Sequence, residues 1–357
     1  MTTTETTPLD EQKLMSFVFR AVDEVGATLN AALVVLGDTL GYYRTLAADG
    51  PSTPEELATA TNTAVPYARE WLNAQAAGAF VEYDGTTGRY SLPPEQAVAL
   101  TDESSPAYLP GLFQIALGTV SDSRAVALAA RQGSGIGWHE HNADVHLGCE
   151  RFFRPSYQAY LVDSWLPAVG LDAQLRQGAR VADVGCGHGA STILMAQAFP
   201  QSRFVGSDYH PASIDVARQR ADEAGVSDRV TFEVASAQGF DGEPFDIVTM
   251  FDCLHDMGDP VGAARHIHDM LRPDGTWMIV EPMAGDQVED NLNPVGRAYY
   301  GFSTLLCTPA SLSQEVGRAL GTQAGPARIR EVTTSAGFTH FRSAAETPFH
   351  RVLEVRR

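Results

Sequence analysis

The chain has 357 residues, of which 44% are hydrophobic and 19% charged, which is typical of a globular protein with room for two domains. Its 44 acidic residues outnumber 25 basic ones, so the formal net charge is −19 at pH 7. Because duplex binding relies on Lys and Arg contacts to phosphates, this charge disfavours nucleic acid as a partner, and anionic membranes likewise. A small molecule or a peptide is the expected partner.

The N-terminal segment, MTTTETTPLDEQ, lacks the basic start and apolar run of a secretory signal. No stretch approaches the roughly 18 apolar residues that a membrane span needs. The four cysteines, Cys149, Cys186, Cys253 and Cys307, are scattered without pair spacing. We therefore expect a soluble cytoplasmic protein with reduced thiols, and neither a disulfide framework nor a zinc site.

The N-terminal region, residues 1–100, shows the pattern of a winged helix. Helical spacing of apolar residues between Leu14 and Leu29 predicts a long amphipathic helix, and a second, mostly buried helix is expected over residues 31–46. Ser52 as N-cap predicts a short third helix, and a fourth covers residues 67–76. Two strands, residues 79–83 and 89–92, flank the turn Asp-Gly-Thr-Thr-Gly.

A winged helix either recognises DNA or serves as a scaffold for dimerisation and for a substrate lid. The second helix of this unit offers only Arg69 as a base, and the wing offers only Arg89, which favours the scaffold. The apolar residues between Leu9 and Leu36 exceed what a small domain can bury alone. The sequence therefore predicts a homodimer formed through the N-terminal half.

Residues 101–168 form a helical connector and lid with a cluster of aromatic and ionisable residues. His139 and His141 are two positions apart and do not share a helical face, and no cysteine or carboxylate has matching spacing. We therefore predict no metal. The cluster is expected to line a substrate pocket, with packing between domains as the alternative, through His139, His141, Arg154 and Tyr157.

Residues 169–357 alternate strands and helices, which predicts an α/β domain with a doubly wound, Rossmann-like sheet. The seven expected strands are residues 180–184, 203–207, 230–234, 245–250, 277–281, 341–347 and 350–355.

A glycine-rich turn, Asp-Val-Gly-Cys-Gly-His-Gly, follows the first of these strands at residues 183–189. Taken alone, it also satisfies the pattern of a dinucleotide site. A pyrophosphate, however, binds best at a helix N-terminus without nearby anions. Asp183, Asp208 and Asp252 stand at the ends of neighbouring strands, and these carboxylates favour a cofactor with ammonium and sulfonium charges. That cofactor is S-adenosylmethionine rather than NAD.

Four segments in order resemble the motifs of class I S-adenosylmethionine-dependent methyltransferases over residues 178–357: D-V-G-C-G-H-G, V-G-S-D, P-F-D-I-V-T-M-F-D-C-L-H-D-M and L-R-P-D-G-T-W-M-I-V-E. With the winged helix, the chain is similar to bacterial small-molecule O-methyltransferases. The resemblance implies that Asp208 holds the ribose and Tyr209 lies beside the adenine. It implies that the methionine portion is cradled by Asp183, Gly185, Gly187 and Gly189.

The chain departs from this family after the third strand of the domain. Many relatives have an Asp there, where this sequence reads Ala235-Ser236-Ala237-Gln238. Ser236 or Gln238 is expected to bond the adenine amino group instead, with Ala237 in the same cofactor segment.

The segment Leu254-His255-Asp256-Met257 resembles the L-H-D-W motif of O-methyltransferases, in which the His is the general base. An attacking hydroxyl must lose a proton, and imidazole accepts one near neutral pH. His255 is therefore the predicted base, with a structural histidine as the alternative. Tyr299 and Phe302, in the segment 287–323, are predicted to grip the acceptor or to form a subunit contact.

The predicted reaction is methyl transfer to a small molecule, with a hydroxyl oxygen as the favoured acceptor. An N- or C-methyltransferase that acts by positioning alone is the alternative within enzymes. Outside enzymes, the alternative is a winged-helix regulator that binds S-adenosylmethionine as a ligand.

Overall fold

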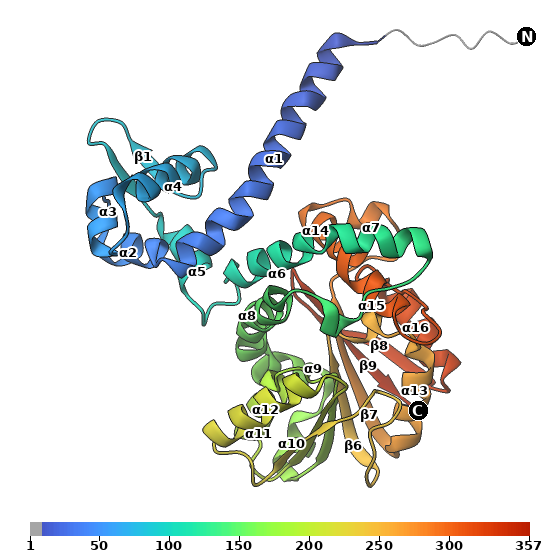
Figure 1. Ribbon diagram of the computed structural model, residues 1–357. Helices are drawn as coiled ribbons and strands as arrows, with labels where there is room; N and C mark the ends of the chain where they lie inside the picture. The colour runs from blue at the N-terminus through green and yellow to red at the C-terminus, as the bar shows by residue number, and fades with distance from the viewer. Residues whose placement is uncertain (1–8) are drawn as a thin grey trace, which may run out of the picture. The chain divides into compact units, whose positions relative to one another are not determined.

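The computed structural model describes residues 9–357 (Figure 1). The chain divides into two compact units, the first ending at Leu117 and the second beginning at Gly118. The elements of the first unit are α1 (Glu11–Thr39), α2 (Tyr42–Asp49), α3 (Pro54–Ala60), α4 (Val65–Ala77), β1 (Glu82–Asp84), β2 (Arg89–Ser91), α5 (Pro94–Thr101) and α6 (Pro110–Ser121), whose last residues lie in the second unit.

Helix α1 runs without interruption where the sequence predicted two helices. Asp10 caps its start by accepting hydrogen bonds from the N–H groups of Gln12 and Lys13, at 3.0 and 3.1 Å. Residues 27–36 contain neither Gly nor Pro, so nothing ends the helix at the expected boundary. The break falls at Gly41 instead, whose φ of 74° suits glycine.

The winged helix predicted from the sequence is confirmed, with a shift at the start of α3. Thr53, not Ser52, is the N-cap: its hydroxyl accepts from the N–H of Glu56, whose carboxylate accepts from the N–H of Thr53. Ser52 pairs with Tyr90 of β2 instead. The core of this unit centres on Trp71, packed against Tyr42 and Tyr43.

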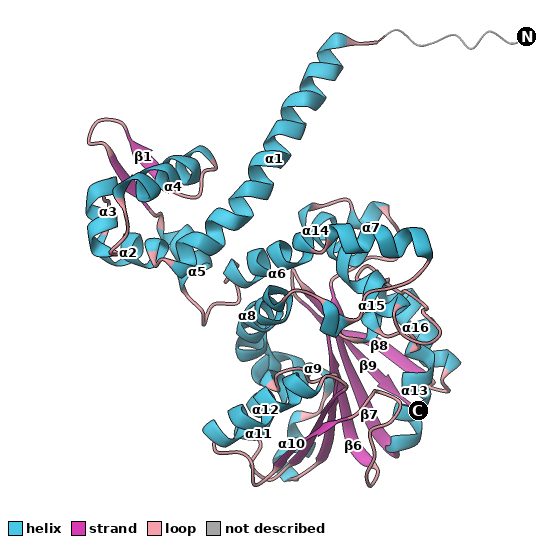
Figure 2. Ribbon diagram, viewed as in Figure 1, coloured by secondary structure: helices cyan, strands magenta, loops and turns pink. Residues whose placement is uncertain are grey.

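The second unit holds a seven-stranded sheet with helices on both faces (Figure 2). Its strands are β3 (Arg180–Val184), β4 (Arg203–Asp208), β5 (Val230–Val234), β6 (Phe245–Phe251), β7 (Leu271–Pro282), β8 (His340–Glu346) and β9 (His350–Arg356). Its helices before β5 are α7 (Ser123–Gln132), η1 (Trp138–Glu140), α8 (Ala143–Tyr160), η2 (Leu161–Trp165), α9 (Leu166–Val169), α10 (Asp172–Gln177), α11 (Ala190–Ala198) and α12 (Pro211–Glu223). The later ones are η3 (Leu254–Asp256), α13 (Pro260–Met270), η4 (Glu289–Asn291), α14 (Pro294–Phe302), η5 (Ser303–Cys307), α15 (Thr308–Leu312) and α16 (Gly325–Ser335).

The strand order is β5-β4-β3-β6-β7-β9-β8, and β3 to β7 pair in parallel. Strand β9 runs antiparallel to both of its neighbours. The order turns at β3 and β6, so the carboxyl ends of these two strands flank the point where a ligand binds in an open α/β sheet. The predicted Rossmann-like fold of seven strands is confirmed.

Each face of the sheet has its own apolar core, because successive residues of a strand point to opposite faces. On one face, Val181 and Ile247 pack with residues of α10, α11 and α12. On the other, Val248 and Trp277 pack with residues of α13 and α16. Figure 1 shows these two groups of helices on opposite sides of the sheet. Helices thus cover both faces of the sheet, and its edge of strand ends is left to hold a site.

Two helical segments are π-helices: η2, which continues α8, and η5, which joins α14 to α15. All four cysteines are free thiols. Over residues 9–357, no helix combines the length and the apolar character of a membrane span.

Candidate active site

The glycine turn joins β3 to α11, and its three glycines have φ values of 75°, 52° and 77°, at Gly185, Gly187 and Gly189. A Cβ at Gly185 would lie 2.6 Å from the Sγ of Cys253, and one at Gly189 would lie 2.6 Å from the ring of Phe232. These two glycines are required by packing. A Cβ at Gly187 would meet no atom within 4 Å, so this backbone is open to the approach of a ligand.

Asp183 supports this turn from beneath. Its side chain is 1% exposed and accepts hydrogen bonds from Ser191 (2.7 Å), Thr192 (2.5 Å) and Thr249 (2.9 Å). Burial raises the pKa of the Asp183 carboxyl, although the three hydroxyl groups act in the opposite direction. Asp183 thus fixes the start of α11 against β3 and β6.

Asp208 ends β4 and connects to the glycine turn. Its carboxylate accepts from the N–H of Gly187 at 3.0 Å and from the N–H of His210 at 2.9 Å. Burial raises the pKa of Asp208. Tyr209 follows with a half-exposed ring, which lies edge-on to His139 with 6.2 Å between the ring centres. The sequence predicted the position of Asp208 but not its bond to the turn.

The segment after β5 lies at the surface. Ser236 is exposed, and Ala237 packs partly against the core on the α13 face. The amide of Gln238 donates to the carboxylate of Asp259 at 2.9 Å. Gln238 is therefore already engaged, which leaves Ser236 as the less constrained of the two predicted adenine contacts.

Asp252 follows β6 in the left-handed backbone region, with φ of 53°. Its carboxylate accepts from the hydroxyl of Tyr157 at 3.0 Å and lies 3.6 Å from Nε2 of His350. Burial raises the pKa of Asp252 well above its usual range, and the nearby Glu281 carboxylate adds to this effect. The structure thus brings together Asp252 and Tyr157, which are 95 residues apart.

His255 lies in η3 and is held between two carboxylates. Its Nδ1 is 2.6 Å from Oε2 of Glu281, and its Nε2 is 3.2 Å from Oδ1 of Asp256. Burial lowers the pKa of His255, but Asp256, Glu281 and a hydrogen bond with Cys307 outweigh burial and hold that pKa well above the usual value. The Glu281 carboxylate also accepts from the N–H of Leu254, so Glu281 fixes both the ring and its loop.

His255, Asp256 and Cys307 each offer a ligand atom, and these atoms lie within 4.8 Å of one another. Among residues 9–357, these three form the cluster whose atoms are close enough to hold a metal ion. The cluster does not include His139 or His141, the pair considered as ligands from the sequence. The three groups already satisfy one another by hydrogen bonds and charge, and the sulfur of Cys307 also accepts from Thr322 at 2.9 Å.

Four of the predicted substrate-pocket residues adjoin the strand ends: Tyr157 bonds Asp252, His139 lies edge-on to Tyr209, and His141 and Tyr299 interact electrostatically with Asp256 and Asp252. His141 is buried and bonds Asp122 through Nδ1 at 2.9 Å. Arg154 lies 3.6 Å from Glu150 on the same helix. Tyr299 of α14 donates to the backbone oxygen of Phe349 at 3.0 Å. Phe302 ends α14 and is half-buried.

Three buried residues near the strand ends were not predicted from the sequence: Glu281, Cys307 and His350. Glu281 carried a usable signal, because it ends a strand in the segment W-M-I-V-E, at the same sheet edge as Asp252. His350 carried none, because its place depends on the antiparallel register that sets it opposite Pro282.

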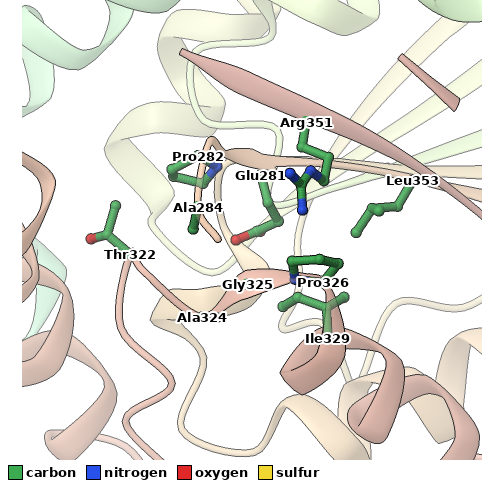
Figure 3. Close-up of a pocket in the computed structure, with 10 residues that line it drawn as sticks. All are labelled: Glu281, Pro282, Ala284, Thr322, Ala324, Gly325, Pro326, Ile329, Arg351 and Leu353. Atoms are coloured by element: carbon green, nitrogen blue, oxygen red, sulfur yellow. The ribbon is translucent and has the colours of Figure 1, made fainter. Parts of the chain in front are cut away.

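A small pocket lies beside Glu281, between the ends of β7 and β9 and the start of α16 (Figure 3). It is lined by Glu281, Pro282, Ala284, Thr322, Ala324, Gly325, Pro326, Ile329, Arg351 and Leu353. Its volume is about 250 Å³, including space open to solvent. The space within it that can hold a water-sized group is about 10 Å³, room for about one water, so the pocket is too small for a nucleoside cofactor.

The residues at the strand ends fit S-adenosylmethionine. Gly187 leaves open backbone beside Asp208, whose carboxylate suits the two hydroxyl groups of a ribose. Around this edge, Asp183, Asp252 and Glu281 are buried acids, which favour a ligand with positive charge.

Comparison with known proteins identifies both units. Residues 175–320 match the family described as methyltransferase domain, and residues 28–102 match the family described as Rv2258c-like winged HTH domain. The 27-O-demethylrifamycin SV methyltransferase of Amycolatopsis mediterranei (strain S699) is 37% identical over 139 residues, which are 37% of this chain and 51% of that protein. The ubiquinone biosynthesis O-methyltransferase of Chelativorans sp. (strain BNC1) is 32% identical over 157 residues, 43% of this chain and 59% of that protein. The chain thus spans about half the length of these curated relatives.

Solved structures share the fold over the whole length. Human N-acetylserotonin methyltransferase in complex with SAM has a TM-score of 0.68 at 17% identity, covering 100% of this chain and 99% of that one. An O-methyltransferase family protein from Burkholderia thailandensis has a TM-score of 0.68 at 18% identity, covering 98% and 99%. The chain therefore contains a methyltransferase domain at residues 175–320 and a winged HTH domain at residues 28–102, and it shares the fold of these solved methyltransferases.

Proposed function

We propose that the chain transfers a methyl group to a hydroxyl oxygen of a small molecule, with His255 as the general base. The observation that carries this proposal is the arrangement of His255 between Glu281 and Asp256, directly after β6. The relatives in ubiquinone biosynthesis and the rifamycin relative are methyltransferases of small molecules, which supports the same class of acceptor.

In this proposal, different residues of the chain bind the cofactor, accept the proton and stabilise the charge that forms. Gly187 and Asp208 bind the cofactor, which supplies an electrophilic methyl group when it is bound. With its Nδ1–H donated to Glu281, a neutral His255 has a lone pair on Nε2 that can take the acceptor's proton. The acceptor hydroxyl replaces Asp256 at Nε2, and the Glu281 carboxylate stabilises the imidazolium that forms.

The decisive experiment is turnover with radiolabelled methyl donor against a library of hydroxyl-bearing metabolites, followed by variants. His255→Ala should lower the turnover number by roughly 10²–10⁴ while cofactor affinity stays intact, because only the proton transfer is lost. His268→Ala is the matched control, since His268 lies on α13 and bonds Asp269. Full activity of His255→Ala with a flat pH profile would favour the alternative, an N- or C-methyltransferase that acts by positioning.

The winged helix serves dimerisation rather than DNA binding in this proposal. Arg89 of the wing binds the carboxylate of Glu56 through two nitrogens, at 2.6 and 2.8 Å, and Arg69 lies 3.4 Å from Glu55. Both basic residues named from the sequence are thus neutralised within their own domain, which weakens the case for phosphate contacts and for the regulator.

Helix α1 supports association with a second copy of the chain. Apolar residues recur along it at alternating steps of three and four, the spacing of a coiled-coil seam: Met15, Val18, Val22, Val25, Leu29, Ala32 and Leu36. These side chains are exposed, Leu29 by 63%. A two-fold pairing of α1 with α1 of another copy covers this seam with an identical one.

A further inference from the structure

The carboxyl of Asp252 is incompletely satisfied at the end of β6. Its side chain is 4% exposed, and Oδ1 has no hydrogen-bond partner within residues 9–357. Oδ2 accepts one hydroxyl, that of Tyr157. Asp183 differs sharply, because three hydroxyl groups compensate its carboxylate. A charge buried with one donor is costly, so Asp252 is stable there only when neutral or when a cation arrives.

His350 does not provide that cation. Its side chain is 1% exposed, and neither ring nitrogen has a hydrogen-bond partner among the described residues. The rings of Phe153 and Trp165 pack on it, each at 5.5 Å between centres. Burial lowers the pKa of His350 to about 3, so the ring is neutral at physiological pH. It lies 3.6 Å from Asp252 without forming an ion pair.

The other titratable groups around Asp252 do not neutralise it either. The pKa of His255 is held well above its usual value, but the charged form of this ring is already paired with the carboxylates of Glu281 and Asp256. The groups that act on Asp252 from the surrounding elements are Tyr157 and Cys149 of α8, His255 and Asp256 of η3, Glu281 of β7, Tyr299 of α14 and His350 of β9.

Asp252 also adjoins the cofactor cradle. The next residue, Cys253, packs its Sγ 3.3 Å from the oxygen of Val184, in the space that a Cβ at Gly185 would occupy. A cation held over the glycine turn therefore lies beside the Asp252 segment. The methyl donor carries two positive groups, a sulfonium and an ammonium.

We infer that Asp252 holds a proton in the free protein and releases it to solvent when the positively charged methyl donor binds, with Tyr157 and His350 shaping the neutral pocket that makes this exchange possible. The inference rests on the proposed function in that S-adenosylmethionine must bind at the glycine turn. No covalent bond changes: one O–H proton leaves Asp252 for the buffer as the cation enters. Cofactor affinity therefore rises with pH until Asp252 is ionised in the free protein.

Calorimetry tests this directly. S-adenosylmethionine is titrated into the full chain at one pH in buffers that differ in ionisation enthalpy, and the slope of heat against that enthalpy counts protons. We expect about one proton released by the wild-type chain and about none by Asp252→Asn, which keeps the side-chain shape. Asp215→Asn, an exposed acid of α12 beside Arg218, is the control and should keep the release.

Binding without proton release in the wild-type chain, or unchanged release by Asp252→Asn, would overturn the inference. Failure of S-adenosylmethionine to bind at all would instead contradict the proposed function. Should Asp252→Asn fail to fold, infrared difference spectra of the wild-type chain decide the matter. The carbonyl band of a protonated carboxyl must disappear on cofactor binding. In Tyr157→Phe, which removes the donor to the carboxylate, the band must persist to a higher pH before cofactor binding removes it.

Discussion

His255 has an unusual position for a base, because two carboxylates and a thiol surround its ring. Burial alone lowers the pKa of His255, but Asp256, Glu281 and Cys307 raise it well above the usual value of about 6.5. A general base must be neutral to accept a proton. We therefore predict that the turnover number rises with pH and that its midpoint lies above about 6.5, measured as a pH–rate profile.

The matched variant for this profile is Glu281→Gln, which keeps an oxygen acceptor for Nδ1 but removes the charge. Its midpoint should move down, and its maximal rate should fall because the imidazolium is no longer stabilised. A wild-type midpoint at or below the ordinary histidine value would contradict the prediction, and so would an unchanged midpoint in Glu281→Gln.

We expect Asp208 to have two roles: its carboxylate accepts from the N–H of Gly187 in the turn, and in the proposed site it binds the ribose. Asp208→Ala should weaken binding of S-adenosylhomocysteine by about 1.5–3 kcal/mol, the scale of hydrogen bonds to a charged acceptor. Isothermal titration measures it. Asp215→Ala, on the exposed surface of α12 beside Arg218, is the control and should bind normally. Equal affinities for the two variants would refute the role.

At the scale of elements, substitutions in the glycine turn allow the effect of packing on stability to be measured separately from the effect of ligand approach on binding. In Gly189→Ala the new methyl meets Phe232, whereas in Gly187→Ala it meets open space. Both changes place alanine at positive φ, which costs roughly 1–2 kcal/mol. We predict that Gly189→Ala loses more free energy of unfolding in urea than Gly187→Ala, and that Gly187→Ala loses cofactor affinity despite its milder effect on folding. The reverse order of stabilities would be inconsistent with this packing.

Helix α1 offers a second prediction at this scale. Val25→Glu places a charge in the middle of the apolar seam, and it should weaken self-association at least about tenfold in sedimentation equilibrium, equivalent to about 1.4 kcal/mol. Ala27→Glu adds the same charge on the opposite side of the helix and should leave association unchanged. A wild-type chain that is strictly monomeric at tens of micromolar would rule out the dimer.

Much of the fold was predictable from the sequence because strand and turn signals are local. Glycine turns and alternating apolar runs located all seven strands to within a few residues, apart from the longer β7. The break between the first two helices was misplaced, since apolar spacing does not reveal that Asn30 and Gly37 continue a helix whose partner surface is Trp71 and Gln75. Local patterns say little about which distant residue will supply a contact.

The same limit applies to the candidate site in the whole molecule. Residues on the glycine turn and directly after β4 and β6 were identified because motif and strand end coincide. Cys307 and His350 come from the last third of the chain and reach the site through a helix junction and an antiparallel strand. Their contacts depend on how distant segments pair in the folded chain. Local patterns in a single sequence do not specify that pairing.

At the scale of the whole molecule, acidic residues have different effects at the surface and at the candidate site. The net charge of −19 disfavours phosphate-rich partners everywhere. At the strand ends, however, the acids are buried rather than solvated, so we expect them to act on one bound cation instead of repelling ligands in solution. The same residue type thus serves two purposes, which composition alone does not distinguish.

The π-helical turn η5 has a consequence for which changes of length the chain can tolerate near the site. A π turn holds one residue more than the α-helical turn it replaces. Removing one residue from Ser303–Cys307 restores a regular helix but rotates one flank by about 100° against the other. Either Cys307 then loses its hydrogen bond with His255, or Tyr299 loses its hydrogen bond with the backbone oxygen of Phe349. Descendants that lose this residue must therefore rebuild one side of the site, whereas substitutions elsewhere in α14 leave it in place.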